Sequence, residues 1–531
     1  MIPGITKGFR VQAIIRNRVG VRKRRSARRL DKFNYPDDLS QPVLRGGNLK
    51  IELAGRAVGT AHGGIGLIHQ LVREVKLAEA IDAKVRLFKI HLPYHESDHV
   101  LNLAYNALCE GRCLEDLELR RQDEAYLNLL GAARIPDPTT AGDFCRRFEL
   151  EDLRGLQEAF DEARRQVWAR QPPEFFAQAR IEADGTMVET GAECKQGIDI
   201  NYKGVWGYHP LVVTLANTKE VLRLENRSGN RPSHEGAAAL LDESVALCRQ
   251  AGFRQIVLRG DTDFSQTKHL DRWHEQADVT FVFGYDCTPL LHLRADDLPD
   301  SAWQPLERPA KYAVKTSPRA RPERVKQPLV EQHQFDDVRL IDEWVAEMPY
   351  RPLACRHTYR LVVVRRNVLV NKPRQARIFE DYRYFFYITD EPATIPPQEI
   401  VFSANDRCDQ ENVLAQLAAA RALHAPVDNL LSNWAYMLTT ALAWNLKTWL
   451  ALWLPAEKGR WHERHLAEKR MLLTCEFRTF VNRLIRLPCQ VLTTGRRLVL
   501  RVLAWNEWQS TFFRLADAFA HPRRGVRPLR C

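Results

Sequence analysis

Two short apolar runs that each end in an aspartate constrain this chain more than any other feature. The first alternates apolar and polar residues over 180–183 and then places Asp184 before Gly185; the second covers 255–260 and ends at Asp261. Each pattern predicts a β-strand that delivers one carboxylate to a turn, although Asp-Gly alone is typical of any turn. Carboxylate oxygens held rigidly at strand ends are suited to a two-metal phosphoryl-transfer site.

The order of the elements around the two aspartates predicts the fold class. Three strands, a helix, a strand, a helix and a strand follow one another, which indicates an α/β domain of the RNase H-like (ribonuclease H-like) architecture. The first and fourth strands are neighbours in that architecture, so Asp184 and Asp261 would meet at one edge of the sheet. The predicted strands are 180–188, 206–215, 220–224, 255–261 and 279–285, and the predicted helices are 235–251 and 267–276.

The regions on either side of this core have different patterns. Residues 46–170 have helical periodicity, and residues 308–324 are rich in proline and arginine, which indicates a loop. Strand patterns at 359–365 and 382–389 predict a small inserted sheet, whereas 409–418, 434–454 and 472–514 are predicted to be helical. We divide the chain into a basic N-terminal arm (1–45), a helical N-terminal DNA-binding region (46–174), the first part of the catalytic core (175–285), a β-rich insertion (286–395), the second part of the core (396–455) and a basic helical C-terminal region (456–531).

The formal net charge of +12 favours a polyanionic partner. Arg and Lys are concentrated in the N-terminal arm, which is either a solvated, disordered tail or an arm on the DNA backbone. The arm has no continuous apolar core, so it is not a signal peptide. Asn445 and Lys447 interrupt the most apolar stretch, so we expect a buried helix there rather than a membrane span. The eleven scattered cysteines indicate reduced thiols and a cytosolic location, and they form no zinc ligand set.

Six segments, in this order, resemble the DDE-type transposases of bacterial insertion sequences, specifically the insertion sequence 1380 type. This resemblance spans roughly residues 45–450 and implies an RNase H-like catalytic domain with three metal-binding carboxylates. The similar segments are 140–148, 181–186, 208–211, 227–230, 259–264 and 407–412.

The resemblance implies a catalytic and metal-binding triad of Asp184, Asp261 and Glu411, with Asp263 as the alternative second ligand. Two Mg²⁺ ions would be bound, and Mn²⁺ could substitute for them. The Arg-x-x-x-Glu spacing places Arg407 and Glu411 one helical turn apart, so that the arginine can hold a DNA phosphate while the glutamate reaches metal. The implied reaction is hydrolysis at the ends of the mobile element followed by strand transfer into target DNA.

Two positions depart from the signature of related transposases. Ala404 stands where a tyrosine is expected before the arginine, and Ala418 stands where a lysine is expected after the glutamate. The nearest later base is Arg421, and we assign Arg407, Arg259 and Arg421 to DNA binding.

Other candidate residues are interpreted as structural. His209, before Pro210, is expected to be a core or turn histidine rather than a metal ligand. Trp303 and Tyr312 are expected to be packed aromatic side chains of the insertion rather than base-stacking groups, and the tryptophans within 434–453 are expected to form a helix core.

The partner expected from the resemblance is double-stranded DNA, both the terminal inverted repeats and the target. A homodimer is expected in the synaptic complex, and the expected location is the nucleoid-associated bacterial cytoplasm. The alternatives are another RNase H-fold DNA nuclease and a non-catalytic DNA-binding descendant of a transposase.

Overall fold

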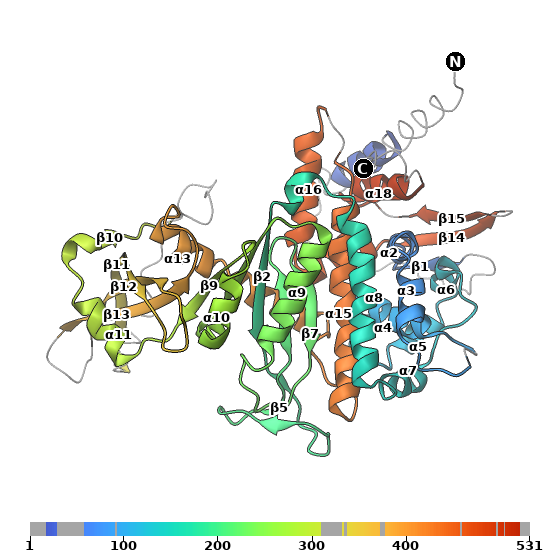
Figure 1. The fold of residues 1–531 in the computed structure, drawn as a ribbon. Helices are drawn as coiled ribbons and strands as arrows, with labels where there is room; N and C mark the ends of the chain where they lie inside the picture. The colour runs from blue at the N-terminus through green and yellow to red at the C-terminus, as the bar shows by residue number, and fades with distance from the viewer. Residues whose placement is uncertain are drawn as a thin grey trace.

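The computed structural model describes residues 17–28, 58–90, 93–308, 332–333, 337–371, 378–456, 459–494, 497–503 and 505–520. A large mixed sheet runs through the molecule; the strands of the insertion form one end of it, and the N-terminal helices lie beyond the other end (Figure 1). Most of the proline- and arginine-rich segment, Tyr312 and the C-terminal arginine tail lie outside the described residues.

The sheet contains nine strands within the described part of the chain, in the order β10-β11-β12-β13-β9-β8-β2-β6-β7. β2 pairs with β8 in parallel and with β6 in antiparallel orientation, and β8 pairs in parallel with β9. The predicted contact between the first and fourth core strands is therefore confirmed. The core strands are β2 (Gln178–Gly185), β6 (Leu211–Leu215), β7 (Glu220–Glu225), β8 (Gln255–Gly260) and β9 (Val279–Tyr285).

Helices cover both faces of the core sheet. α9 (Ala237–Ala251) packs on β2, β6, β7 and β8, and α10 (Thr267–His274) packs on β9. α13 (Pro397–Asn405) and α14 (Cys408–Ala419) lie against the other face, where α14 contacts β2 and α13 contacts β9. Side chains alternate between the two faces along a strand, so every second residue of β2 faces α14.

The N-terminal region is helical, as predicted. Its longest helix, α8, lies beside the long buried helix α15 (Leu430–Trp453) in Figure 1, and the two are in contact. No helix among the described residues is long and apolar enough to cross a membrane. The helices of this region are α2 (Ile65–Glu74), α3 (Leu77–Lys84), α4 (Glu96–Leu108), α5 (Leu117–Arg121), α6 (Glu124–Leu130), α7 (Pro138–Cys145) and α8 (Leu150–Trp168).

The insertion does not form a separate small sheet, which corrects the prediction. Its strands β11 (Asp337–Tyr350), β12 (Tyr359–Asn371) and β13 (Ile378–Thr389) extend the core sheet, because β13 pairs with β9. An unpaired outer edge on β9 would leave backbone N–H and C=O groups without partners. The insertion also contains α11 (Pro289–Asp296) and β10 (Gln304–Pro305).

The predicted strand over 206–215 is two strands in different sheets. β5 (Trp206–Tyr208) belongs to a small sheet with β3 (Val188–Glu189) and β4 (Asp199–Ile200), whereas β6 begins at Leu211. Pro210 separates β5 from β6, and proline has no N–H to donate to a ladder.

The outer edge of β7 is covered by side chains from α8 and α15. Asn445 accepts from the Val221 N–H at 2.9 Å and donates to the Val221 carbonyl at 3.0 Å. The Gln157 side chain accepts from the Leu224 N–H at 3.1 Å. The backbone groups of this edge strand are therefore satisfied without another strand.

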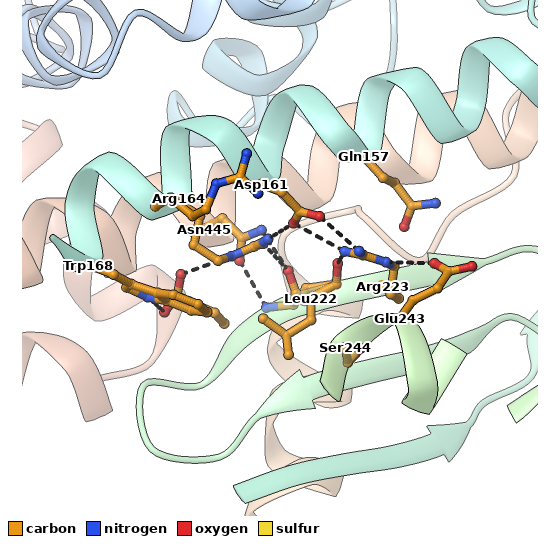
Figure 2. A network of polar contacts seen from close by, with 12 residues as sticks. Gln157, Asp161, Arg164, Trp168, Leu222, Arg223, Glu243, Ser244 and Asn445 are labelled. Atoms are coloured by element: carbon orange, nitrogen blue, oxygen red, sulfur yellow. Dashed lines mark hydrogen bonds and ion pairs between the residues drawn. The ribbon is translucent and has the colours of Figure 1, made fainter. Parts of the chain in front are cut away.

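Buried charges hold α8 against β7 and α9 (Figure 2). Arg223 contacts Asp161 of α8 at 2.8 Å and Glu243 of α9 at 2.9 Å. Arg164 contacts both Asp161 and the fully buried Glu220, the latter at 3.2 Å. Each charge in this network has an opposite partner, as buried charges require.

The C-terminal region is only partly helical, contrary to the prediction for 472–514. β14 (Cys489–Thr494) and β15 (Arg497–Val502) form an antiparallel hairpin, and β14 also pairs with β1 (Gly59–Thr60). Alternating β-branched and leucine residues in these strands suit a half-buried ladder, and this pattern has the two-residue period of a strand, not the 3.6-residue period of a helix. The helical parts are α16 (His462–Thr474), α17 (Phe477–Phe480), a π-helical turn (Val481–Ile485) and α18 (Gln509–Ala520).

Part of the basic N-terminal arm is folded. Residues 17–28 form a helix, and the Arg22 Nη1 donates to the Val502 carbonyl at 2.9 Å. The interpretation of the arm as a disordered tail is therefore wrong for this segment; the rest of the arm lies outside the described residues.

Candidate active site

Asp184 and Asp261 lie side by side at the carboxyl edge of the core sheet. Asp184 is the next-to-last residue of β2, and Asp261 directly follows β8. The parallel register pairs Glu182 with Arg259. Since each aspartate comes two positions after its member of that pair, both carboxylates leave the sheet at the same level and on the same face.

The helix α14 brings Glu411 to the same face. Gln410, which is fully buried, donates to the Val212 carbonyl at 2.9 Å and accepts from the Thr214 hydroxyl at 3.0 Å, both on β6. This contact fixes the first turn of α14 on the sheet and leaves Glu411 exposed to solvent. Gln410 was not singled out from the sequence, where a glutamine between Asp409 and Glu411 looks like another surface residue.

Arg407, at the N-cap of α14, lies between the two aspartates. Its Nη1 is 3.3 Å from Asp184 Oδ2, and its Nη2 is 3.9 Å from Asp261 Oδ2. The guanidinium is mostly buried, so this contact is stronger than a solvent-exposed ion pair. The arginine predicted to hold a phosphate thus faces carboxylates in this structure.

The pKa values of both aspartates are raised, mainly by burial. Burial raises the pKa of Asp184 to about 6; Asp261 and Glu411 also raise it, while Arg407 lowers it. The pKa of Asp261 is raised by burial and by the nearby Asp263 and Glu411. Crowded carboxylates destabilise one another's ionised forms, so this cluster would gain from additional positive charge.

Arg259, which the sequence assigns to DNA binding, is buried in this structure, and its contact with DNA stays a prediction. It is 3% exposed, forms an ion pair with the buried Glu182, and donates to the Ser403 carbonyl at 2.6 Å. Burial raises the pKa of Glu182 to about 7, while Arg259 lowers it. Because Ser403 belongs to α13, this pair joins β2 and β8 to the segment that leads to Arg407.

The remaining predicted residues lie around this centre at different distances. Asp263 is exposed and donates its N–H to Asp261 at 3.0 Å, so it supports the turn after β8. Arg421 follows α14, and about 12 Å of helix axis separates Glu411 from the end of that helix. The structure therefore does not bring Arg421 to the carboxylates.

Two structural interpretations made from the sequence are confirmed. The His209 Nδ1 lies 2.8 Å from the Arg231 carbonyl, as expected of a turn histidine. Its ring packs so closely on Gly185 that a Cβ there would lie 2.9 Å from His209 Cε1. Trp303 is buried, with the guanidinium of Arg365 4.3 Å from its ring centre.

The residues of this site fit divalent metal ions by their chemistry. Three carboxylates on β2, β8 and α14 supply the hard oxygen ligands that Mg²⁺ and Mn²⁺ prefer. Their oxygens do not all lie within 4.8 Å of one another, because Arg407 stands between the two aspartates.

A tighter cluster elsewhere in the described residues has another explanation. Ligand atoms of Asp82, His95 and Glu96 lie within 4.8 Å of one another. Asp82 accepts from the N–H and hydroxyl of Ser97, and Glu96 accepts from the N–H of Leu87 and Phe88. These bonds fix the start of α4, so the cluster is structural.

One family model matches most of the chain. The family model described as Transposase DDE domain group 1 matches residues 41–523. A cryo-EM structure of a piggyBac transposase synaptic complex with hairpin DNA is 13% identical, with a TM-score of 0.31 over 81% of this chain and 84% of that chain. No curated protein matches.

Proposed function

The chain belongs to the family of transposases with a group 1 DDE domain, and from this premise we propose that it cuts the ends of a mobile DNA element and joins them to target DNA. The observation that supports this proposal best is the convergence of Asp184, Asp261 and Glu411 from two adjacent strand ends and one helix. Phosphoryl transfer with two metal ions uses such carboxylates as metal ligands and needs no protein nucleophile.

Asp184, Asp261 and Glu411 would hold two Mg²⁺ ions, for which Mn²⁺ can substitute. When bound, such ions activate the attacking hydroxyl and neutralise charge on the leaving oxygen. Water would attack in the cleavage step, and the freed 3′-hydroxyl would attack in strand transfer. Both are in-line displacements at phosphorus, so one set of carboxylates can serve both.

The side chains around the carboxylates would position them. Asp184 and Asp261 sit on paired parallel strands, which limits how far either can move. Arg407 would leave the aspartates and contact a DNA phosphate, since guanidinium binds carboxylate and phosphate by the same bidentate geometry. Arg421 is proposed as a second phosphate contact, farther along the duplex.

The finer assignments made from the sequence belong to the same proposal. The strand order β7-β6-β2-β8-β9 supports an RNase H-like core, which the insertion would divide into parts covering 175–285 and 396–455. We also propose membership of the insertion sequence 1380 type, double-stranded DNA as partner, a homodimer in the synaptic complex and a nucleoid-associated location in bacteria.

A cleavage assay tests the proposal. The substrate is a duplex carrying one end of the element with its flank, incubated with the full chain in Mg²⁺ or EDTA. We expect Mg²⁺-dependent nicking that is lost with Asp184→Ala, Asp261→Ala or Glu411→Ala and kept with Asp263→Ala. Loss with Asp263→Ala but not Asp261→Ala would move the second ligand by two residues.

The two alternatives give different results in this assay. A non-catalytic descendant would bind the element end without nicking it under any condition. Another RNase H-fold nuclease would cut the duplex in a metal-dependent way but would never join the product to target DNA.

A further inference from the structure

A hairpin of β4 and β5 carries exposed apolar side chains that the proposed reaction does not use. Ile200 and Trp206 are directly opposite in the antiparallel pair, so they lie on the same face. Tyr202 is in the turn between them. Their exposed fractions are 42% for Ile200, 52% for Trp206 and 92% for Tyr202. The exposed part of each side chain contributes no apolar burial to the fold.

The turn of this hairpin has a defined shape. The Asn201 side chain accepts from the N–H of Lys203 at 2.9 Å and of Val205 at 3.0 Å. Gly204, at φ 79°, supplies the left-handed backbone that closes the turn. The Lys203 Nζ lies 5.3 Å from the centre of the Tyr202 ring, which is a cation–π distance.

The base of the hairpin is packed closely on its neighbours. A Cβ on Gly207 would lie 2.1 Å from the Val188 carbonyl oxygen, and one on Gly229 would lie 2.3 Å from the Asp199 carbonyl oxygen. The Tyr208 hydroxyl donates to the Gln196 carbonyl at 2.7 Å. The hairpin is therefore held rigidly, and its exposed rings are presented at a fixed position.

This position is next to the carboxylates. β3 begins three residues after Gly185, the last residue of β2, and pairs with β5. His209, directly after β5, touches Gly185. The hairpin consequently projects beyond the edge of the sheet that carries Asp184 (Figure 1). A DNA strand with a phosphate at Asp184 would extend past it.

We propose that Tyr202 and Trp206 form a stacking platform for unpaired DNA bases beside the cleavage site. This inference rests on the proposed function and names the form of DNA that the site takes. Aromatic rings bind bases through their faces, and a cation next to a ring adds to that interaction. Three exposed side chains match one or two bases, whereas a stable protein partner covers 20 or more residues.

The salt dependence of DNA binding distinguishes stacking on the platform from contacts to phosphate. The hairpin segment 199–207 contains one base, Lys203, and one acid, Asp199, so its formal net charge is zero. The contribution of the rings to DNA affinity should therefore be the same at low and at moderate salt, whereas arginine contacts to phosphate weaken as salt rises.

The test measures binding of the full chain, without divalent metal, to two fluorescent probes. One is an oligothymidylate of about 20 nucleotides and the other a blunt duplex of about 20 base pairs. The variants are Tyr202→Ala/Trp206→Ala and the ring-retaining Tyr202→Phe/Trp206→Phe. Leu353→Ala, which removes a fully exposed apolar side chain from the insertion, is the control.

The alanine pair is expected to bind the oligothymidylate at least about tenfold more weakly at every salt concentration, with little change for the duplex. The phenylalanine pair and Leu353→Ala should bind like the parent chain. Unchanged oligothymidylate affinity in the alanine pair, or an equal loss on both probes, would overturn the platform. Failure of nicking in Mg²⁺ with a retained ring effect would instead overturn only the proposed transposase activity.

Discussion

The Arg407 Nη1 lies 3.3 Å from Asp184 Oδ2 and its Nη2 lies 3.9 Å from Asp261 Oδ2, so one guanidinium bridges the two adjacent strand ends. The same arginine is the residue that the Arg-x-x-x-Glu spacing assigns to DNA phosphate. The guanidinium binds carboxylates and phosphates by the same electrostatic contact, and it cannot bind the two aspartates and a phosphate fully at the same time. Arg407 therefore links the charge of the carboxylates to the binding of DNA.

Replacing Arg407 should change metal and DNA affinity in opposite directions. Arg407→Gln removes a positive charge from between the aspartates, so Mn²⁺ should bind about three- to tenfold more tightly, while duplex DNA binds more weakly. Electron paramagnetic resonance of free Mn²⁺ and fluorescence anisotropy of the duplex measure the two affinities. Arg464→Gln, which breaks an exposed ion pair to Glu468, is the matched control. Weaker Mn²⁺ binding in Arg407→Gln would contradict this account.

Mn²⁺ binding should fall as the pH is lowered through about 6. The pKa of Asp184 is raised to about 6 in the folded chain, so its carboxylate is ionised at pH 7 and protonated below pH 6. Because metal binding requires the ionised form, affinity should drop about tenfold per pH unit below that value. The raised pKa of Asp261 should steepen the fall.

The raised pKa of Asp184 should also make the stability of the fold depend on pH. The folded state binds the proton more tightly than the unfolded state, so the metal-free chain should lose stability as the pH rises from about 4 to 6 and change little above. Asp184→Asn should make this slope shallower in a thermal denaturation series without abolishing it, because the pKa values of Asp261 and Glu182 are raised as well. An unchanged slope in the variant would show that Asp184 does not contribute to it.

Local patterns predicted the two strands and the helix that carry the three acids, because strand ends and helix starts leave signals within a few residues. The pairing of β2 with β8 followed from the order of elements, whereas the assignment of Asp184, Asp261 and Glu411 as a metal-binding triad stays a prediction. These features depend on near neighbours in the sequence. The side-chain partners of Arg259 and Arg407, in contrast, come from distant parts of the sequence.

The features that the sequence did not predict share a physical cause, which is contact between distant parts of the chain. Arg259 looks like a surface base until Glu182 and Ser403 bury it, and they lie 77 and 144 positions away. The pairing of β13 with β9 likewise depends on which edge is free after the core has formed. The arginine network on β7 left no signal, since Glu220 and Arg164 resemble solvent-exposed charges of a strand and a helix.

Neutralising Glu220 should destabilise the fold. This carboxylate is fully buried and accepts hydrogen bonds from Arg164, Trp168 and Trp449. Glu220→Gln keeps the volume but turns one acceptor into a donor and leaves buried charge unbalanced, which should cost about 3 kcal/mol. Glu243→Gln, at the exposed end of the same network, should cost less than about 1 kcal/mol. Chemical denaturation of both variants measures the difference, and equal costs would show that burial is not what makes Glu220 important.

The pair of Glu182 and Arg259 separates a structural role from a DNA-binding role. Arg259→Met leaves Glu182 as an unpaired buried acid, so the free energy of unfolding should fall by about 3 kcal/mol. Glu182→Met/Arg259→Met replaces the whole ion pair with apolar side chains of similar size, and much of that loss should be recovered. Since Arg259 faces Ser403 and not solvent, the salt dependence of duplex binding should be the same in the parent chain and the double variant. Arg407→Gln should reduce the slope of log affinity against log salt by about 0.9, the value for one phosphate contact. A comparable reduction in the double variant would show that Arg259 reaches DNA after all and that the ion pair opens on binding.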